Sequence, residues 1–102
     1  ALRPTPASVI VTVFDKSLMG VSARIAAQLR SGGVNTELFP EAAKLDRQMK
    51  YANTQVIPIA IIIGPDEAAQ GRATVRDLRS GAQQVVAQDQ IVAVVGSLLQ
   101  SA

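Results

Sequence analysis

Residues 57–63 read Ile-Pro-Ile-Ala-Ile-Ile-Ile, the most apolar run in the chain. The run is short and does not alternate with polar residues, which predicts a strand buried on both faces. Pro58 is compatible with this, because the first residues of a strand need not donate to the ladder. Residues 9–14, Val-Ile-Val-Thr-Val-Phe, have the same character. Two such strands are typical of a parallel sheet covered by helices on both sides.

The segment between these two strands predicts helix, strand and helix. The first helix follows the N-cap candidates Asp15 and Ser17, ends at Gly32-Gly33, and buries the stripe Leu18, Val21, Ile25 and Leu29. Residues 35–39 form a short strand that Pro40 ends. The second helix is expected over residues 41–53. Its buried stripe is Ala42, Leu45, Met49 and Ala52, and its other side carries Lys44, Arg47, Lys50 and Tyr51.

The last third of the chain predicts a hairpin and a helix. Residues 72–78 and 82–87 are strand-like and are joined through Gly81, and the final helix begins near Gln88. Right-handed crossovers place the first strand between the second and third. We therefore expect an α/β fold, a three-layer α/β/α domain with a mixed five-stranded sheet of order 2-1-3-4-5 and an antiparallel fourth strand. Residues 1–7 are expected to be a linker and residues 8–102 the domain.

The composition excludes much catalytic chemistry. The chain has 102 residues, 48% of them hydrophobic and 18% charged, with no Cys and no His. Disulfides, thiolate metal sites and the usual general base are therefore ruled out. No apolar run approaches the roughly 18 residues of a membrane span, so we expect a soluble, cytoplasmic protein with no membrane partner.

The sheet order predicts a ligand crevice beyond the carboxyl ends of the first and third strands. A phosphate-binding loop there would need several glycines, and the segment after the first strand offers only Gly20. Asp15, Asp66 and Glu67 are carboxylates suited to Mg²⁺, but they are too few for a site. Helix capping is the favoured role for Asp15 and for at least one of the other acids.

The basic residues leave two readings open. Lys44, Arg47 and Tyr51 recur along one side of the second helix, and Arg72, Thr74 and Arg76 share one face of the fourth strand. Such a set can neutralise phosphates and stack an unpaired base on Tyr51. A solvated face of Arg and Lys is the other reading, with a net charge of only +2.

Three phrases in order resemble the C-terminal anticodon-binding domain of histidyl-tRNA synthetase, a class II aminoacyl-tRNA synthetase. They are the helix phrase Gln-Met-Lys-Tyr-Ala (residues 48–52), the strand followed by Gly-Pro-Asp-Glu (61–67) and the hairpin Val-Arg-Asp-Leu-Arg-Ser-Gly (75–81). The resemblance covers nearly all of residues 8–99. It differs where the family often has Gly before the third strand, because this chain has Gln55-Val56, so the turn there must be built differently.

The resemblance implies which residues meet RNA. Glu67, after the third strand, and Arg76, in the fourth, occupy the positions that read anticodon bases in related synthetases, and a carboxylate and a guanidinium suit base edges. The second helix would add Arg47, Gln48 and Lys50, with Tyr51 as a stacking candidate.

The resemblance also implies partners and cofactors. The partners are the anticodon stem-loop of histidine tRNA and the catalytic domain of the same chain, and the full-length parent is expected to be a homodimer. This domain has no catalytic residue, cofactor or metal, whereas the parent, a histidine-tRNA ligase, uses ATP and Mg²⁺ in its catalytic domain. Two alternatives stay open. One is a regulatory or assembly domain of a synthetase-like paralogue, such as the regulatory subunit of ATP phosphoribosyltransferase. The other is a free-standing nucleotide-binding protein of flavodoxin-like architecture.

Overall fold

The computed structural model describes residues 7–100. The elements are β1 (Val9–Val11), α1 (Met19–Ser31), β2 (Thr36–Leu38), α2 (Leu45–Thr54), β3 (Ile59–Ile62), α3 (Pro65–Ala69), β4 (Arg72–Asp77), β5 (Gln83–Ala87) and α4 (Ile91–Gln100). Single 3₁₀ turns, Lys16–Leu18 and Gln88–Gln90, precede α1 and α4. The predicted order of strands and helices is confirmed.

The five strands form one mixed sheet of order β2-β1-β3-β4-β5. β1 pairs in parallel with β2 and β3, while β4 runs antiparallel to both β3 and β5. This is the predicted sheet, because each β-α-β crossover adds a parallel neighbour and each hairpin adds an antiparallel one.

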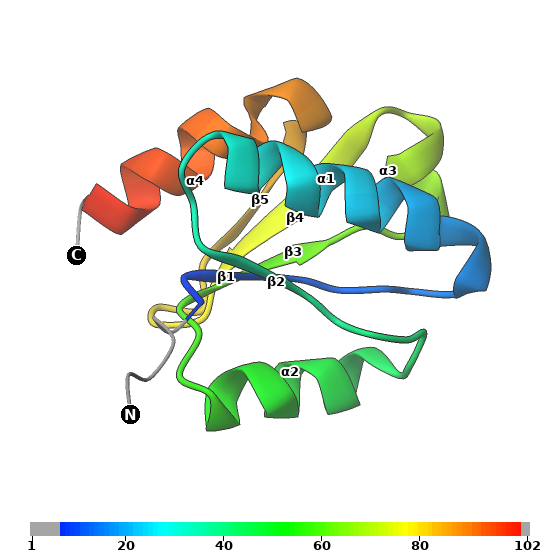
Figure 1. The fold of residues 1–102 in the computed structure, drawn as a ribbon, viewed down its shortest axis with the longest axis horizontal. Coiled ribbons are helices and arrows are strands. Elements are labelled where there is room, and N and C mark those ends of the chain that lie inside the picture. Colours follow the sequence, from blue (N-terminus) through cyan, green and yellow to red (C-terminus); the bar gives the residue numbers. More distant parts are fainter. Residues whose placement is uncertain (1–6, 101–102) are drawn as a thin grey trace.

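The helices lie on both faces of the sheet (Figure 1). α1, α3 and α4 cover one face and α2 lies alone on the other. The larger apolar cluster lies under α1 and α4 and includes Ile25, Ile61 and Val75. The smaller cluster lies under α2 and takes its strand residues from β1 and β3, Ile10 and Ala60. No residue of β4 or β5 belongs to the α2 cluster within the described chain, so α2 covers only part of its face.

β1 is shorter than the predicted strand 9–14. Thr12 still donates its N–H to the Ile61 carbonyl over 3.0 Å, but the Val13 N–H donates to the side-chain Oε1 of Gln48 over 2.8 Å. The strand ends because a side chain of α2 takes the place of a neighbouring strand at Val13. Phe14, expected inside the strand, is 54% exposed.

α2 begins at Leu45, four residues later than predicted, and its predicted stripe packs against the smaller cluster except at Leu45. The N-cap residue Lys44 is extended, with ψ 141°, and the Gln48 Nε2 donates to the Ala43 carbonyl over 2.8 Å. The Ala43 carbonyl is therefore bonded to a side chain, and the helix begins only after this residue. Gln48 and Ala52 are the buried residues of α2, whereas Leu45, expected in the stripe, is 38% exposed.

The turn leaving α2 is a Schellman motif with an unusual residue. Val56 N–H donates to the Asn53 carbonyl over 3.1 Å, and Ile57 N–H donates to the Ala52 carbonyl over 2.9 Å. This motif requires a left-handed residue, usually Gly. Here Val56 has φ 57°. The turn at Gln55-Val56, expected to be built differently, is thus an ordinary Schellman turn with Val56 in the left-handed position that Gly usually takes.

The predicted linker, residues 1–7, lies outside the described residues except for Ala7, which packs partly against the α2 cluster. Within residues 7–100 no helix is long and apolar enough to cross a membrane.

Candidate nucleic-acid interface

Side chains of β4 that point away from α1 and α4 lie on a sheet face that α2 leaves open. Alternation places Arg72, Thr74 and Arg76 on this face. Their register partners share it except for Ala60, which lies under α2, and we call the set the open sheet face, made of Ile62, Arg72, Thr74, Arg76, Gln83, Val85 and Ala87. The set contains two arginines and no acidic residue. Its charge therefore favours an anionic ligand.

Arg76 has an unsatisfied donor on this face. The residue is half-buried and stands opposite Ala60 of β3 and Gln83 of β5. Its Nε is shielded from solvent and has no hydrogen-bond partner among residues 7–100. Buried donors are nearly always paired, so an unpaired one in a planar, forked guanidinium points to a missing acceptor.

Glu67 is held by the turn that starts α3. Gly64 N–H donates to the Glu67 Oε1 over 3.0 Å, which caps the short helix after β3. A Cβ at position 64 would lie 3.0 Å from that oxygen, so glycine gives the carboxylate its place. The second oxygen, Oε2, has no hydrogen bond within the described residues, and Glu67 is half-buried. The predicted capping role of an acid here is confirmed.

Glu67 and Arg76 lie at different positions along the strand direction of the sheet. Glu67 follows the carboxyl end of β3, whereas Arg76 pairs with Ala60, two residues before the end of that strand. No ion pair or hydrogen bond joins them in the described structure. A ligand meeting both would run from the end of β3 onto the open sheet face.

Two predicted residues of α2 are exposed cations. Arg47 and Lys50 are exposed, and Arg47 lies 3.6 Å from the Glu41 carboxylate in a pair whose side chains are 68% and 62% exposed. Such a surface pair is weak and readily exchanged for another anion.

Gln48 is committed to the protein interior. Its side chain is 1% exposed, accepts from Val13 N–H over 2.8 Å, and donates to the carbonyls of Val13 and Ala43 over 2.9 and 2.8 Å. The amide group has no surface left for a ligand. The expectation that the Gln48 side chain contacts RNA is therefore at odds with the structure, because the backbone of β1 uses the amide.

Tyr51 is held at the opposite side of α2 from the open sheet face. Its hydroxyl donates to the Glu37 carboxylate, and its ring meets Phe39 edge to face with centroids 5.6 Å apart. The hydrogen bond to Glu37, then burial and the Glu37 charge, raise the pKa of Tyr51 above its usual value. Both contacts orient the ring against β2, so stacking of a base on Tyr51 would need the ring to leave Phe39.

Phe14 is a candidate that the sequence reasoning missed. It lies beyond the carboxyl end of β1 and is 54% exposed, next to Val13, which Gln48 joins to α2. Its place in an apolar run made it look like a strand residue. The signal that could have found it is the following Asp15, which accepts from Ser17 N–H over 2.8 Å and caps a 3₁₀ turn that begins directly after Phe14 and Asp15.

The predicted crevice has no visible cation site. Within residues 7–100 no group of three or more His, Cys, Asp or Glu side chains could hold a metal. Asp15 instead caps the 3₁₀ turn that precedes α1, whereas α1 itself has Leu18 at its N-cap and no side-chain cap.

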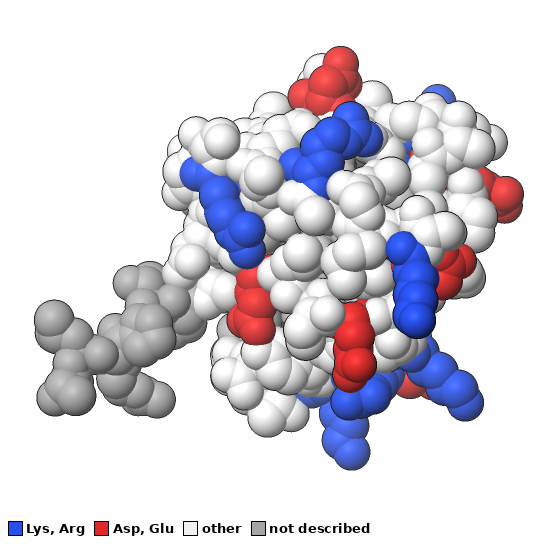
Figure 2. Space-filling model, turned by 45° about the vertical axis from the view of Figure 1, so that its right-hand side comes forward, with Lys and Arg blue, Asp and Glu red and all other residues white. Residues whose placement is uncertain are grey.

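Charges of both signs are mixed on the face shown in Figure 2. Blue side chains alternate with red ones, and several blue side chains gather at the lower edge, where α2 lies in Figure 1. A mixed surface of this kind favours selective contacts over strong nonspecific attraction.

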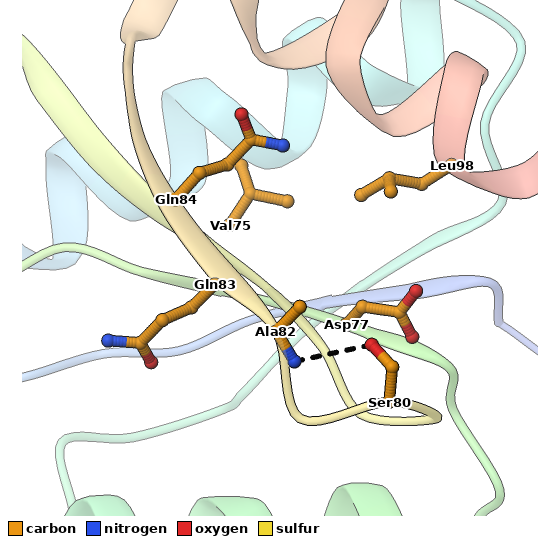
Figure 3. A pocket seen from close by; sticks show the side chains of 7 residues that line it. All are labelled: Val75, Asp77, Ser80, Ala82, Gln83, Gln84 and Leu98. Carbon is orange, nitrogen blue, oxygen red and sulfur yellow. Dashed lines mark hydrogen bonds between the residues drawn. The ribbon is translucent and has the colours of Figure 1, made fainter.

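A separate hollow of about 160 Å³ lies on the other sheet face, between the β4-β5 hairpin and α4 (Figure 3). It is lined by Val75, Asp77, Ser80, Ala82, Gln84 and Leu98, and by Gln83, whose side chain points away from it. Asp77 is paired with Arg79 over 3.0 Å, and Arg79 Nη2 also donates to the Leu98 carbonyl over 3.0 Å. Arg79 thereby ties the hairpin to α4, and the hollow has no unpaired cation for an anionic ligand.

Comparison with known proteins adds three observations. The family model described as an anticodon binding domain matches residues 8–98. Histidine--tRNA ligase of Bacteroides fragilis is 35% identical over 79 residues, which are 78% of this chain and 17% of that protein. Histidine--tRNA ligase of Trichormus variabilis is 40% identical over 86 residues, 84% of this chain and 19% of that protein. The chain thus spans less than a fifth of the length of these curated relatives.

Solved structures agree with the fold. Histidyl-tRNA synthetase from Nostoc sp. PCC 7120 superposes with a TM-score of 0.90 at 35% identity, over 93% of this chain and 23% of that one. The RNA binding domain of threonyl-tRNA synthetase from Cryptosporidium parvum Iowa II superposes with a TM-score of 0.82, over 91% of this chain and 24% of that one. At 18% identity the second similarity concerns the fold alone.

Proposed function

The chain belongs to the family of anticodon-binding domains, and from this premise we propose that it binds the anticodon stem-loop of histidine tRNA as part of a longer histidine-tRNA ligase. The observation that carries the proposal is Arg76, whose Nε is shielded and unpaired on an open sheet face without acidic residues. The relatives reported above are histidine-tRNA ligases, which favours this function over a regulatory or assembly domain.

The proposed contacts divide by the kind of group they meet. Arg76 and Glu67 meet base edges, because a guanidinium donates in a fork and a carboxylate accepts from base amino or imino groups. Arg47 and Lys50 meet phosphates, because both are exposed cations at one side of α2. Tyr51 and Gln48 act indirectly, by holding α2 against β2 and β1.

The longer ligase supplies the chemistry. Attachment of histidine to tRNA with ATP and Mg²⁺ belongs to a catalytic domain elsewhere in that protein, which we expect to work as a cytoplasmic homodimer. The role of this domain is to grip the RNA at a distance from the reacting 3′ end.

The test is fluorescence anisotropy with a labelled stem-loop bearing the anticodon GUG and with a second one whose anticodon is scrambled, at two salt concentrations. We expect a preference for GUG that persists at the higher salt, since base contacts depend less on counterion release than phosphate contacts do. Equal and salt-labile binding of both RNAs, or no binding with protein at about 0.1 mM, the weak end of nonspecific affinities, would overturn the proposal.

Variants separate the two kinds of contact. Arg76→Ala should weaken GUG binding by about tenfold or more and reduce the preference for GUG, as loss of a base contact of about 1–3 kcal/mol implies. Arg47→Ala and Lys50→Ala should weaken the binding of both RNAs alike and lower the salt dependence of that binding. Arg30→Ala on α1 is the matched control, because it removes the same charge from the opposite side of the sheet. An Arg76→Ala protein with unchanged discrimination would remove Arg76 from the site.

A further inference from the structure

A row of three side chains crosses the open sheet face from β3 to β5. The register pairs Ile62 with Thr74 and Thr74 with Val85, so the three stand side by side. Ile62 and Thr74 are half-buried, whereas Val85 is 53% exposed. The row therefore presents a flat, largely aliphatic strip that rises to the surface on β5.

Two arginines flank this strip. Arg72 and Arg76 lie two residues to either side of Thr74 on the same face of β4. Residues two apart on a strand are about 6.7 Å apart, so the two arginine Cα atoms are separated by about 13 Å. That gap accommodates one flat ring on the strip with a cation at each side.

Neither helix layer covers the strip. α1 and α4 pack on the other face through Ala73, Val75 and Val86, and the α2 cluster contains no residue of β4 or β5 within residues 7–100. An exposed aliphatic residue between cations suits a ligand with apolar faces and negative charges, which describes a nucleotide better than an apolar protein surface.

We infer that the Ile62–Thr74–Val85 row is a platform on which one unpaired base of the RNA loop packs, with Arg72 meeting a phosphate and Arg76 a base edge beside it. The inference rests on the proposed RNA binding and extends that site to β5. It makes Val85 a contact residue, although nothing in its chemistry resembles a conventional RNA ligand. Unpaired bases of any sequence can pack on a sheet surface, because every base has a flat π-face.

The test compares two substitutions that make the same charge change on neighbouring residues of one strand. Val85→Glu places a carboxylate on the platform between the arginines, and Gln84→Glu places one on the opposite face, where Gln84 lines the hollow near α4. We expect Val85→Glu to weaken binding of the GUG stem-loop by about tenfold and Gln84→Glu to change it by less than about twofold at 0.15 M salt, since long-range charge effects are then screened.

A gain of binding gives a second readout. Val85→Phe enlarges the platform with a side chain that suits an exposed strand position, and stacking on an aromatic ring should tighten binding by about fivefold or more. In stem-loops carrying 2-aminopurine at each loop position in turn, the fluorescence of one position should be quenched more by the Val85→Phe protein than by the wild type. Thermal midpoints and circular dichroism of all variants establish that they are folded.

The outcomes distinguish this inference from the proposed function. If the wild type binds GUG selectively and Arg76→Ala weakens it, while Val85→Glu matches Gln84→Glu and Val85→Phe changes nothing, the platform is wrong and the RNA-binding function stands. If the wild type shows no selective binding, the proposed function fails and the platform fails with it.

Discussion

Gln48 of α2 clamps both backbone polar groups of Val13 at the end of β1. Val13 N–H donates to Gln48 Oε1 over 2.8 Å, and Gln48 Nε2 donates to the Val13 carbonyl over 2.9 Å. The amide thus continues the hydrogen bonding of the sheet beyond the last paired residue. It also holds α2 over the smaller cluster, and the positions of Arg47 and Lys50 depend on this placement of the helix.

Gln48→Leu should lower the free energy of unfolding by about 2–4 kcal/mol. The substitution keeps the size of the side chain similar but replaces the amide with an apolar group, so the buried Val13 N–H and carbonyl are left unpaired, at about 1–3 kcal/mol for each buried group. Urea unfolding measures it. Asn53→Leu, at an exposed position of the same helix, should change stability by less than about 1 kcal/mol. A Gln48→Leu protein that is fully stable but has lost RNA binding would instead make Gln48 an RNA contact.

Gly64→Ala should weaken RNA binding with little effect on stability. The new Cβ would lie 3.0 Å from Glu67 Oε1, so the carboxylate would have to shift by a few tenths of an ångström, which disturbs its bond to Gly64 N–H. We expect affinity for the GUG stem-loop to fall by roughly threefold to tenfold, part of the value of a base contact. Gly20→Ala, where a Cβ meets nothing within 4 Å, is the control. Equal affinities for the two variants would show that the place of Glu67 is immaterial to binding.

Val56→Gly should stabilise the domain by about 1 kcal/mol. Val56 has φ 57° and is 81% exposed, and a non-glycine residue in this region costs about 1–3 kcal/mol, offset in part by the greater freedom of glycine in the unfolded chain. The midpoint of thermal unfolding should rise by about 4–8 °C. Gln55→Gly, one residue earlier at a right-handed φ of −84°, should lower it. A drop in both midpoints would contradict the strain at Val56.

The phenol of Tyr51 should titrate above its usual pKa of about 10. Its hydroxyl donates to Glu37, and that bond holds the proton on the phenol in the folded protein. The raised pKa stabilises the fold at pH values below about 10, and that contribution is lost as the pH rises through the folded value. The chain has one Tyr and no Trp, so absorbance near 295 nm reports this group alone. Glu37→Gln should bring the midpoint down, and an unchanged midpoint would rule out the hydrogen bond.

Asp77 should make acid stability depend on Arg79. The hydrogen bonds from the Arg79 side chain, over 3.0 Å to each carboxylate oxygen, are the main cause of the lowered pKa of Asp77. Its stabilising effect is present above the ordinary Asp pKa of about 3.9 and is lost as the pH falls through the lowered value. Asp77→Asn and Arg79→Ala should each flatten the fall in stability between about pH 4 and pH 2. If the double variant were flatter than either single one, the two groups would act independently.

Much of the fold was predictable because it follows from local pattern and chain topology. The uninterrupted apolar runs at residues 9–14 and 57–63 predicted strands buried on both faces, and crossover handedness then placed β1 between β2 and β3. Gly33 and Gly81 were assigned to turns and have φ of 85° and 80°. These features depend on neighbouring residues, on the period of the apolar residues and on the handedness of the crossovers, all of which can be read from the sequence.

Tertiary structure alone decided which polar side chains are available to a ligand. Gln48 and Arg47 are adjacent in sequence and both suit RNA, yet Gln48 is buried because β1 ends within reach of its amide, and Arg47 is exposed. The same holds for the two aromatic residues. Tyr51, expected to be open to a base, is held by Glu37 and Phe39. Phe14, expected inside a strand, belongs to neither apolar cluster of the described residues. The sequence by itself determined the order, type and pairing of the strands and helices. Exposure and hydrogen-bond partners depend on contacts between segments far apart in the chain, and only the packed structure decides those.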